Sequence, residues 1–188
     1  MKSTSEAAPV AAPKLQAALR SLWHGHIVHT REYAMAVHEH NDAKAKAAAN
    51  AVVANAKQIA NAVAGFYGKP AGDQMLKLLA GHWAGVKALT DAGAANDANA
   101  QKQAIADLSA NATAIAEFLS GANPNWPKDA VQSMLATHVA HHSTEVQQIM
   151  TGDTQGEQTT WAAMQAHMDT VADALAAGIA KQFPNKAS

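Results

Sequence analysis

Apolar residues recur every three or four positions over six stretches of the chain, which is the spacing of amphipathic α-helices. The stretches cover about 15–41, 43–66, 70–92, 97–121, 127–150 and 155–182. Glycine, proline and asparagine gather between them, where helices end and begin. Few aromatic residues and abundant alanine also favour helices. The pattern predicts an all-α protein, a six-helix and mainly antiparallel bundle.

Three histidines in the apolar stripes are equally spaced: His26, His82 and His138 lie 56 residues apart (82 − 26 and 138 − 82). Apolar neighbours share this register, in the sets Trp23, Leu79, Leu135; Ile27, Trp83, Val139; Ile59, Ile115, Val171; and Val63, Leu119, Leu175. A shared register over whole helices is the signature of an internal repeat. We therefore expect three repeated helical hairpins with a period of 56 residues.

Each predicted hairpin carries a second polar residue in an apolar stripe, 29 positions after its histidine. These residues are Asn55, Asn111 and His167. The midpoints of the hairpins hold residues that favour turns and helix N-caps, namely Asn41, Asp97 and Asp153. Because the two arms of each hairpin are nearly equal in length, we expect all six polar side chains to lie in one buried layer.

Two interpretations of this layer are open. In the first, histidines and asparagines hydrogen-bond one another and only fix the register of the helices, in a structural or partner-binding module. In the second, converging neutral imidazoles bind zinc, copper or nickel. The expected ligands are then His26, His82, His138 and His167, with Asn55 and Asn111 orienting their rings.

Other histidines lie near this layer in the sequence. His138 and His142, four residues apart, would present two imidazoles on one helix face, which suits metal capture. His29 and His141 occupy equivalent positions in two of the hairpins. We regard His29, His141 and His142 as possible auxiliary metal ligands.

Several function classes are disfavoured by the sequence. A net charge of −1 and scattered lysines argue against nucleic-acid binding. The Glu-x-x-His spacing of di-iron bundles and the His-Glu-x-x-His motif of zinc proteases are absent, and so is cysteine. Glu145 and Asp173 are isolated carboxylates and a weak enzyme signal, so catalysis is left undecided. A b-type haem or another small ligand held by the core histidines stays an alternative.

The domain organisation is simple. Residues 1–14 are rich in serine, alanine and proline and predict a flexible lead, followed by one helical domain over 15–184. The lead lacks the apolar segment of a signal peptide, but such a stretch often follows a removed one, so we expect a periplasmic or secreted protein, and otherwise a cytoplasmic one. No apolar run is long enough to span a membrane.

The chain also resembles a family of small bacterial helical proteins that has no established activity. The shared motifs are Trp23-x-x-His26 with Thr30-Arg31, Phe66-Tyr67-Gly68, His82, Asn111-Ala112 with Ile115-Ala116 and Phe118-Leu119, Asn123-Pro124, His138 with Thr144-Glu145, Ala172-Asp173, Gly178-Ile179 and Gln182-Phe183-Pro184. They span nearly all of 15–184. The resemblance implies a common helical fold and no particular function.

Overall fold

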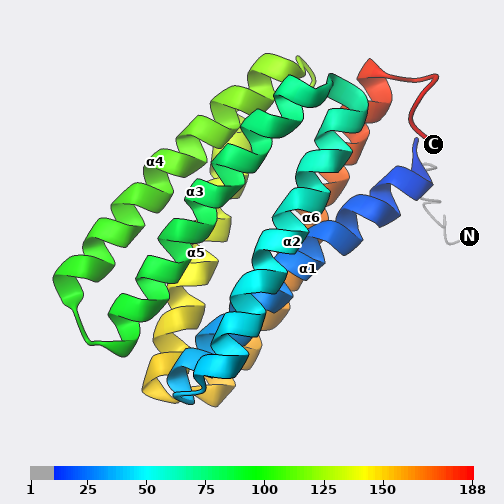
Figure 1. Ribbon diagram of the computed structural model, residues 1–188. Coiled ribbons are helices and arrows are strands. Elements are labelled where there is room, and N and C mark those ends of the chain that lie inside the picture. Colours follow the sequence, from blue (N-terminus) through cyan, green and yellow to red (C-terminus); the bar gives the residue numbers. More distant parts are fainter. Residues whose placement is uncertain (1–10) are drawn as a thin grey trace, which may run out of the picture.

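The computed structural model describes residues 11–188, which form an antiparallel bundle of helices (Figure 1). The helices are α1 (Pro13–His38), α2 (Asp42–Tyr67), α3 (Lys69–Ala94), α4 (Ala98–Ala122), α5 (Lys128–Thr151) and α6 (Thr154–Gln182). The predicted all-α six-helix bundle is confirmed. The beginning of α1 lies beside the C-terminal residues, and the Leu15 N–H donates to the Ser188 carbonyl at 2.8 Å.

The limits of α1 differ slightly from the predicted ones. Residues 1–10 of the predicted lead lie outside the described residues, while Pro13 and Lys14 already belong to the helix. Proline suits this position because the first N–H groups of a helix have no intrahelical partner. At its other end α1 stops at His38, since Asn41 serves instead as the N-cap of α2.

Each hairpin turn places a capping residue where the sequence predicts one. The side chains of Asn41, Asp97 and Asp153 accept hydrogen bonds from the N–H groups three residues further on, at 3.0, 3.0 and 2.9 Å. Such caps satisfy N–H groups that would otherwise lack a partner. Between α2 and α3, Gly68 has a φ of 91°, a conformation that glycine adopts without strain.

The helices form an inner and an outer set. The inner helices α1, α3 and α5 all contact one another, whereas each of the outer helices α2, α4 and α6 packs mainly against two inner helices. A side chain on the inward face of α1, α3 or α5 therefore points toward a common axis. A side chain on an outer helix reaches the groove between its two inner neighbours.

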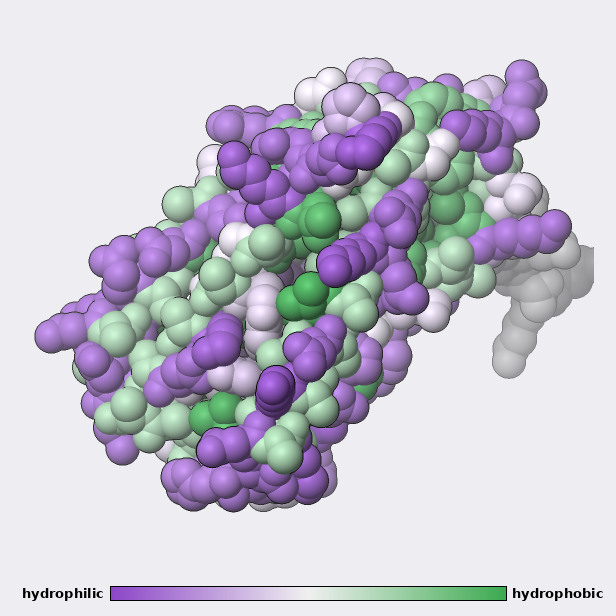
Figure 2. Space-filling view, viewed as in Figure 1, coloured by the Kyte–Doolittle hydropathy of each residue, from purple (hydrophilic) through white to green (hydrophobic). Residues whose placement is uncertain are grey.

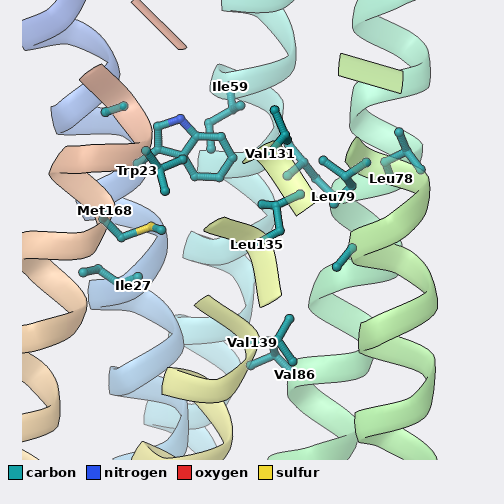
Figure 3. Packing of buried hydrophobic residues seen from close by; sticks show 14 of the residues in the cluster. Trp23, Ile27, Ile59, Leu78, Leu79, Val86, Val131, Leu135, Val139 and Met168 are labelled. Atoms are coloured by element: carbon teal, nitrogen blue, oxygen red, sulfur yellow. The ribbon is translucent and has the colours of Figure 1, made fainter. Parts of the chain in front are cut away.

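Apolar side chains fill the space around this axis. Figure 3 shows Leu79 and Val86 of α3 and Leu135 and Val139 of α5 directed into the same core, with Trp23 of α1 near Ile59 of α2. All of these are buried. Burial of each large apolar side chain is worth about 1.5–3 kcal/mol, so this packing is the main stabilising contribution to the bundle.

The outer helices are fastened to the inner ones by three similar hydrogen bonds. Asn55 Nδ2 donates to the Leu22 carbonyl at 2.9 Å, Asn111 Nδ2 donates to the Leu78 carbonyl at 3.0 Å, and His167 Nε2 lies 2.8 Å from the Met134 carbonyl oxygen. In each pair the partners are 33 residues apart. The 56-residue period itself stays a prediction from the sequence.

On the face shown in Figure 2, polar residues separate the apolar ones. The face in Figure 2 mixes charged and polar residues with alanine, and large apolar residues form only small separate patches. Within residues 11–188, Val53 and Ile105 are the large apolar side chains that are exposed. Over the same residues, none of the helices combines the length and the apolar character needed to cross a bilayer.

The close approach of α2 and α3 makes a testable prediction. A Cβ added at Gly72 would lie 2.7 Å from Ala64 Cβ and 2.9 Å from the Ala60 carbonyl oxygen, so Gly72→Ala forces the two helices apart. Overpacking of about 1–3 kcal/mol outweighs a helix-propensity gain of about 1 kcal/mol. We expect a net loss of about 1 kcal/mol in the free energy of unfolding, measured with urea. Gly65→Ala in α2 is the matched control: it meets open space and should stabilise the protein.

Candidate metal centre

Four histidines lie together at the axis of the bundle. His26 comes from α1, His82 from α3, and His138 and His142 from successive turns of α5. All four are buried, with at most 6% of their surface exposed. They converge because each stands on the inward face of an inner helix, where the helical spacing of their apolar neighbours places it.

The ring nitrogens of these histidines are closely grouped. His26 Nε2 lies 3.1 Å from His138 Nε2, 3.3 Å from His142 Nε2 and 3.2 Å from His82 Nε2, and His138 and His142 are 2.9 Å apart. The four coordinating atoms all lie within 4.8 Å of one another. In a tetrahedral site with metal–nitrogen bonds of about 2.0–2.1 Å, neighbouring nitrogens are roughly 3.3 Å apart. The observed cluster has nearly this size.

Hydrogen bonding between the rings cannot account for all of these contacts. A neutral imidazole nitrogen carries either one proton or one lone pair. Four Nε2 atoms therefore make at most two N–H···N hydrogen bonds, whereas four pairs lie within hydrogen-bond distance. Because His26, His138 and His142 contact one another pairwise, at least one of their contacts brings two lone pairs or two protons together, which a cation bound between the nitrogens would relieve.

Burial keeps the four imidazoles neutral. It lowers the pKa of His82 to about 4. The pKa values of His26, His138 and His142 also lie well below 6.5, because burial, and then the neighbouring histidines, disfavour the charged form. At neutral pH the lone pairs are thus available to a metal ion without prior loss of a proton.

The structure brings three of the four predicted ligands together, but not His167. This residue is on the outer helix α6, and its Nε2 contacts the Met134 carbonyl oxygen. His142 is grouped with the three in its place. The sequence held a signal for it, the spacing of four residues from His138, but gave no reason to prefer it over the evenly spaced His167.

Asn55 and Asn111 form their hydrogen bonds with backbone groups and not with the clustered histidines. Their side chains contact carbonyl oxygens of Leu22 and Leu78, one helical turn before His26 and His82, and their own Oδ1 atoms are buried without a partner. Equal arm lengths led us to expect one layer. The single layer stays a prediction, and the structure shows these two residues bound to the backbone of the neighbouring inner helices.

The two remaining auxiliary histidines lie outside the cluster. His29 is partly exposed, and its Nδ1 lies 3.0 Å from Glu32 Oε2 on the same helix. The ring of His141 packs edge-on against that of His167, with centroids 5.5 Å apart. Neither residue is in the group of four.

An apolar cavity of about 30 Å³ borders His82 and His138. Apolar side chains line the rest of it, among them Trp23, Leu79 and Leu135. A volume of this size holds about one or two water molecules. It is far smaller than a haem or a typical organic ligand.

A group of charged side chains lies one turn further along α5. Glu145 and Glu157 are buried, with 1% and 4% of their surface exposed. Arg31 binds Glu157 through two nitrogens, with Arg31 Nη2 at 3.0 Å from Glu157 Oε2, while its Nε lies 3.8 Å from Glu145 Oε1. Burial, and then Glu157, raise the pKa of Glu145 to about 8. Asp173, by contrast, pairs with Arg20 near the surface at 2.7 Å.

These pKa shifts predict a pH dependence of stability. Since the folded-state pKa values of the four histidines are below 6.5, the unfolded chain binds more protons once the pH drops under that value. The contribution of these four groups to the stability of the metal-free protein should be fully present well above pH 6.5 and be lost as the pH is lowered toward 4. His82→Gln should reduce the slope by about 1.2 kcal/mol per pH unit between pH 5 and 6 in urea unfolding. An unchanged slope would contradict this, and His24→Gln, at an exposed position, is the control.

Comparisons of the chain with known proteins do not supply a function. No family model matches it, no curated protein matches it, and no solved structure matches it. The sequence resemblance to small bacterial helical proteins stays a prediction. The four-histidine centre is therefore interpreted through its own geometry and chemistry.

Proposed function

We propose that this protein binds one transition-metal ion through the Nε2 atoms of His26, His82, His138 and His142. The observation that carries the proposal is the grouping of four neutral imidazole nitrogens at tetrahedral spacing in a buried core. Nitrogen-rich sites of this kind favour zinc, copper and nickel over magnesium or calcium, which prefer oxygen ligands.

The main competing interpretation is a layer that only fixes the register of the helices. Such a layer is stable when every buried polar atom has a partner. Two hydrogen bonds can pair the four Nε2 atoms, but His26 Nε2 also lies 3.1 Å from His138 Nε2 and 3.3 Å from His142 Nε2, and His138 Nδ1 is buried without any partner. A purely structural layer would gain nothing from this crowding, so the geometry supports the metal site.

The ligand set also bears on what the metal would do. Four protein ligands complete a tetrahedral shell, whereas catalytic zinc sites keep a position open for water or substrate. Metal storage, capture or structural stabilisation therefore fits the centre better than catalysis. A b-type haem fits less well, because four nitrogens this close leave no room for a porphyrin between them.

A protein-binding module is the second candidate function from the sequence. Large contiguous apolar patches mark such surfaces. The described surface holds only isolated exposed apolar side chains, Val53 and Ile105, so this alternative has less support than the metal site.

We further propose the cell envelope as the location. The proposal rests on the serine-, alanine- and proline-rich composition of residues 1–14. Fractionation of cells that express the native gene tests it: recovery with the cytoplasmic fraction alone would contradict an envelope location.

Metal titration of two leucine variants tests the centre. Tag-free protein should bind one Co²⁺ with the intense visible absorption of tetrahedral coordination, and Zn²⁺ should displace it. His142→Leu removes a ligand and should weaken Co²⁺ binding at least 100-fold, because about 3 kcal/mol or more is lost with one of four bonds. His167→Leu, which removes a histidine outside the cluster, should leave the affinity within about threefold of wild type.

The opposite pattern would sink this assignment. If His167→Leu abolished binding and His142→Leu did not, the ligand set proposed from the sequence would be correct. If the wild-type protein showed no specific binding of Co²⁺, Zn²⁺, Ni²⁺ or copper, the metal function itself would fall.

A further inference from the structure

The buried carboxyl group of Glu145 lies beside Glu157 and Arg31, but its Oε1 atom has no hydrogen-bond partner. The nearby Arg31 guanidinium uses its two closest contacts on Glu157. Glu145 Oε1 is 3.8 Å from Arg31 Nε, beyond hydrogen-bond distance, and is buried without a partner. The hydroxyl of Thr30, one turn beyond His26, donates to the His26 and Ile27 carbonyls of its own helix and is not available either.

This carboxyl group lies close in the sequence, and on the same helix, to a histidine of the proposed metal centre. Glu145 follows His142 by three residues on α5, so the two side chains share a helix face and their backbone positions differ by about 4.5 Å along the helix axis. Glu145 and Glu157 are the buried carboxylates of the described chain. Of these two, Glu157 is hydrogen-bonded to Arg31, and only Glu145 lacks a hydrogen-bonded cation.

Charge balance in the core explains what such a group would do. Four neutral histidines provide no negative charge, so a divalent ion would bring two uncompensated positive charges into a buried site. A buried charge without a counter-charge is strongly disfavoured. An ionised carboxylate nearby lowers this penalty, and its Coulomb attraction is twice as large for a divalent ion as for a monovalent one.

We infer that Glu145 is the counter-charge of the four-histidine centre and selects divalent over monovalent transition-metal ions. The inference rests on the proposed metal function and deepens it. Glu145 is not itself a ligand in this account: it acts at short range through its charge. In the metal-free protein it is mostly protonated at pH 7, because burial raises its pKa to about 8.

The groups around Glu145 determine which residue would release a proton when a metal ion binds. The charged groups that face Glu145 are Arg31 of α1 and Glu157 of α6. Arg31 stays protonated and binds Glu157 through two nitrogens, while burial keeps the His142 imidazole neutral. Binding of a divalent ion should therefore release about one proton, and that proton comes from Glu145.

The experiment compares wild type, Glu145→Gln and Glu117→Gln, with Co²⁺ as the divalent probe and Cu⁺ as the monovalent one. Glutamine keeps the size of the side chain and removes its charge. Glu145→Gln should weaken Co²⁺ binding at least tenfold and change Cu⁺ binding by less than about threefold. Glu117 lies on the surface, paired with Lys128, so its replacement should leave both affinities unchanged.

Proton release gives a second measurement that does not depend on the folding of a variant. In weakly buffered solution at pH 7, wild-type protein should release about one proton per Co²⁺ bound, and its Co²⁺ affinity should rise close to tenfold per pH unit below pH 8. Binding without proton release would overturn the inference. Equal losses of Co²⁺ and Cu⁺ affinity in Glu145→Gln would overturn it too, since they would show a structural role.

The outcomes separate this inference from the function on which it rests. If wild-type protein binds neither ion, the metal function fails, and the role of Glu145 fails with it. If wild-type protein binds Co²⁺ through the histidines but Glu145→Gln binds it equally well, the metal function stands and only the counter-charge is refuted.

Discussion

The convergence of four neutral imidazoles at the axis of three inner helices is the constraint around which the structure is arranged. Each histidine is buried. Four pairs of their Nε2 atoms lie within hydrogen-bond distance, although the four atoms can form at most two hydrogen bonds. Apolar side chains, among them Trp23, Leu79 and Leu135, line the cavity that borders two of the histidines. A metal ion at the centre of the group would satisfy all four lone pairs at once, which is why we connect the fold to metal binding.

The inner and outer helices contribute differently to this arrangement. Inner helices direct side chains at the axis, so residues on them can meet one another. Outer helices fill the grooves between the inner ones. Their polar residues Asn55, Asn111 and His167 contact backbone carbonyl oxygens of the inner helices. These bonds hold each outer helix in register beside its partner. The four clustered histidines thereby stand on helices rather than on loops, which favours a preformed site.

The four-histidine cluster lies one helical turn from the charged group of Arg31, Glu145 and Glu157, so the charges of the two groups are related. Burial lowers the pKa values of the histidines and raises that of Glu145, so the metal-free core approaches neutrality, with Arg31 and Glu157 balancing each other. Such a core tolerates the absence of metal at neutral pH. In our proposal Glu145 would lose its proton when a divalent metal ion binds. The metal affinity of the site would then depend on a residue that is not itself a ligand.

The sequence by itself determined the number and type of helices, the capping residues of the hairpin turns, and the burial of His26, His82 and His138. These follow from apolar spacing and from local turn chemistry, which act over a few residues. The identity of the fourth clustered histidine was decided only by the tertiary structure. His142 and His167 are both histidines on apolar stripes, and nothing local distinguishes them. The difference arises because α5 is an inner helix and α6 an outer one, which depends on how all six helices pack.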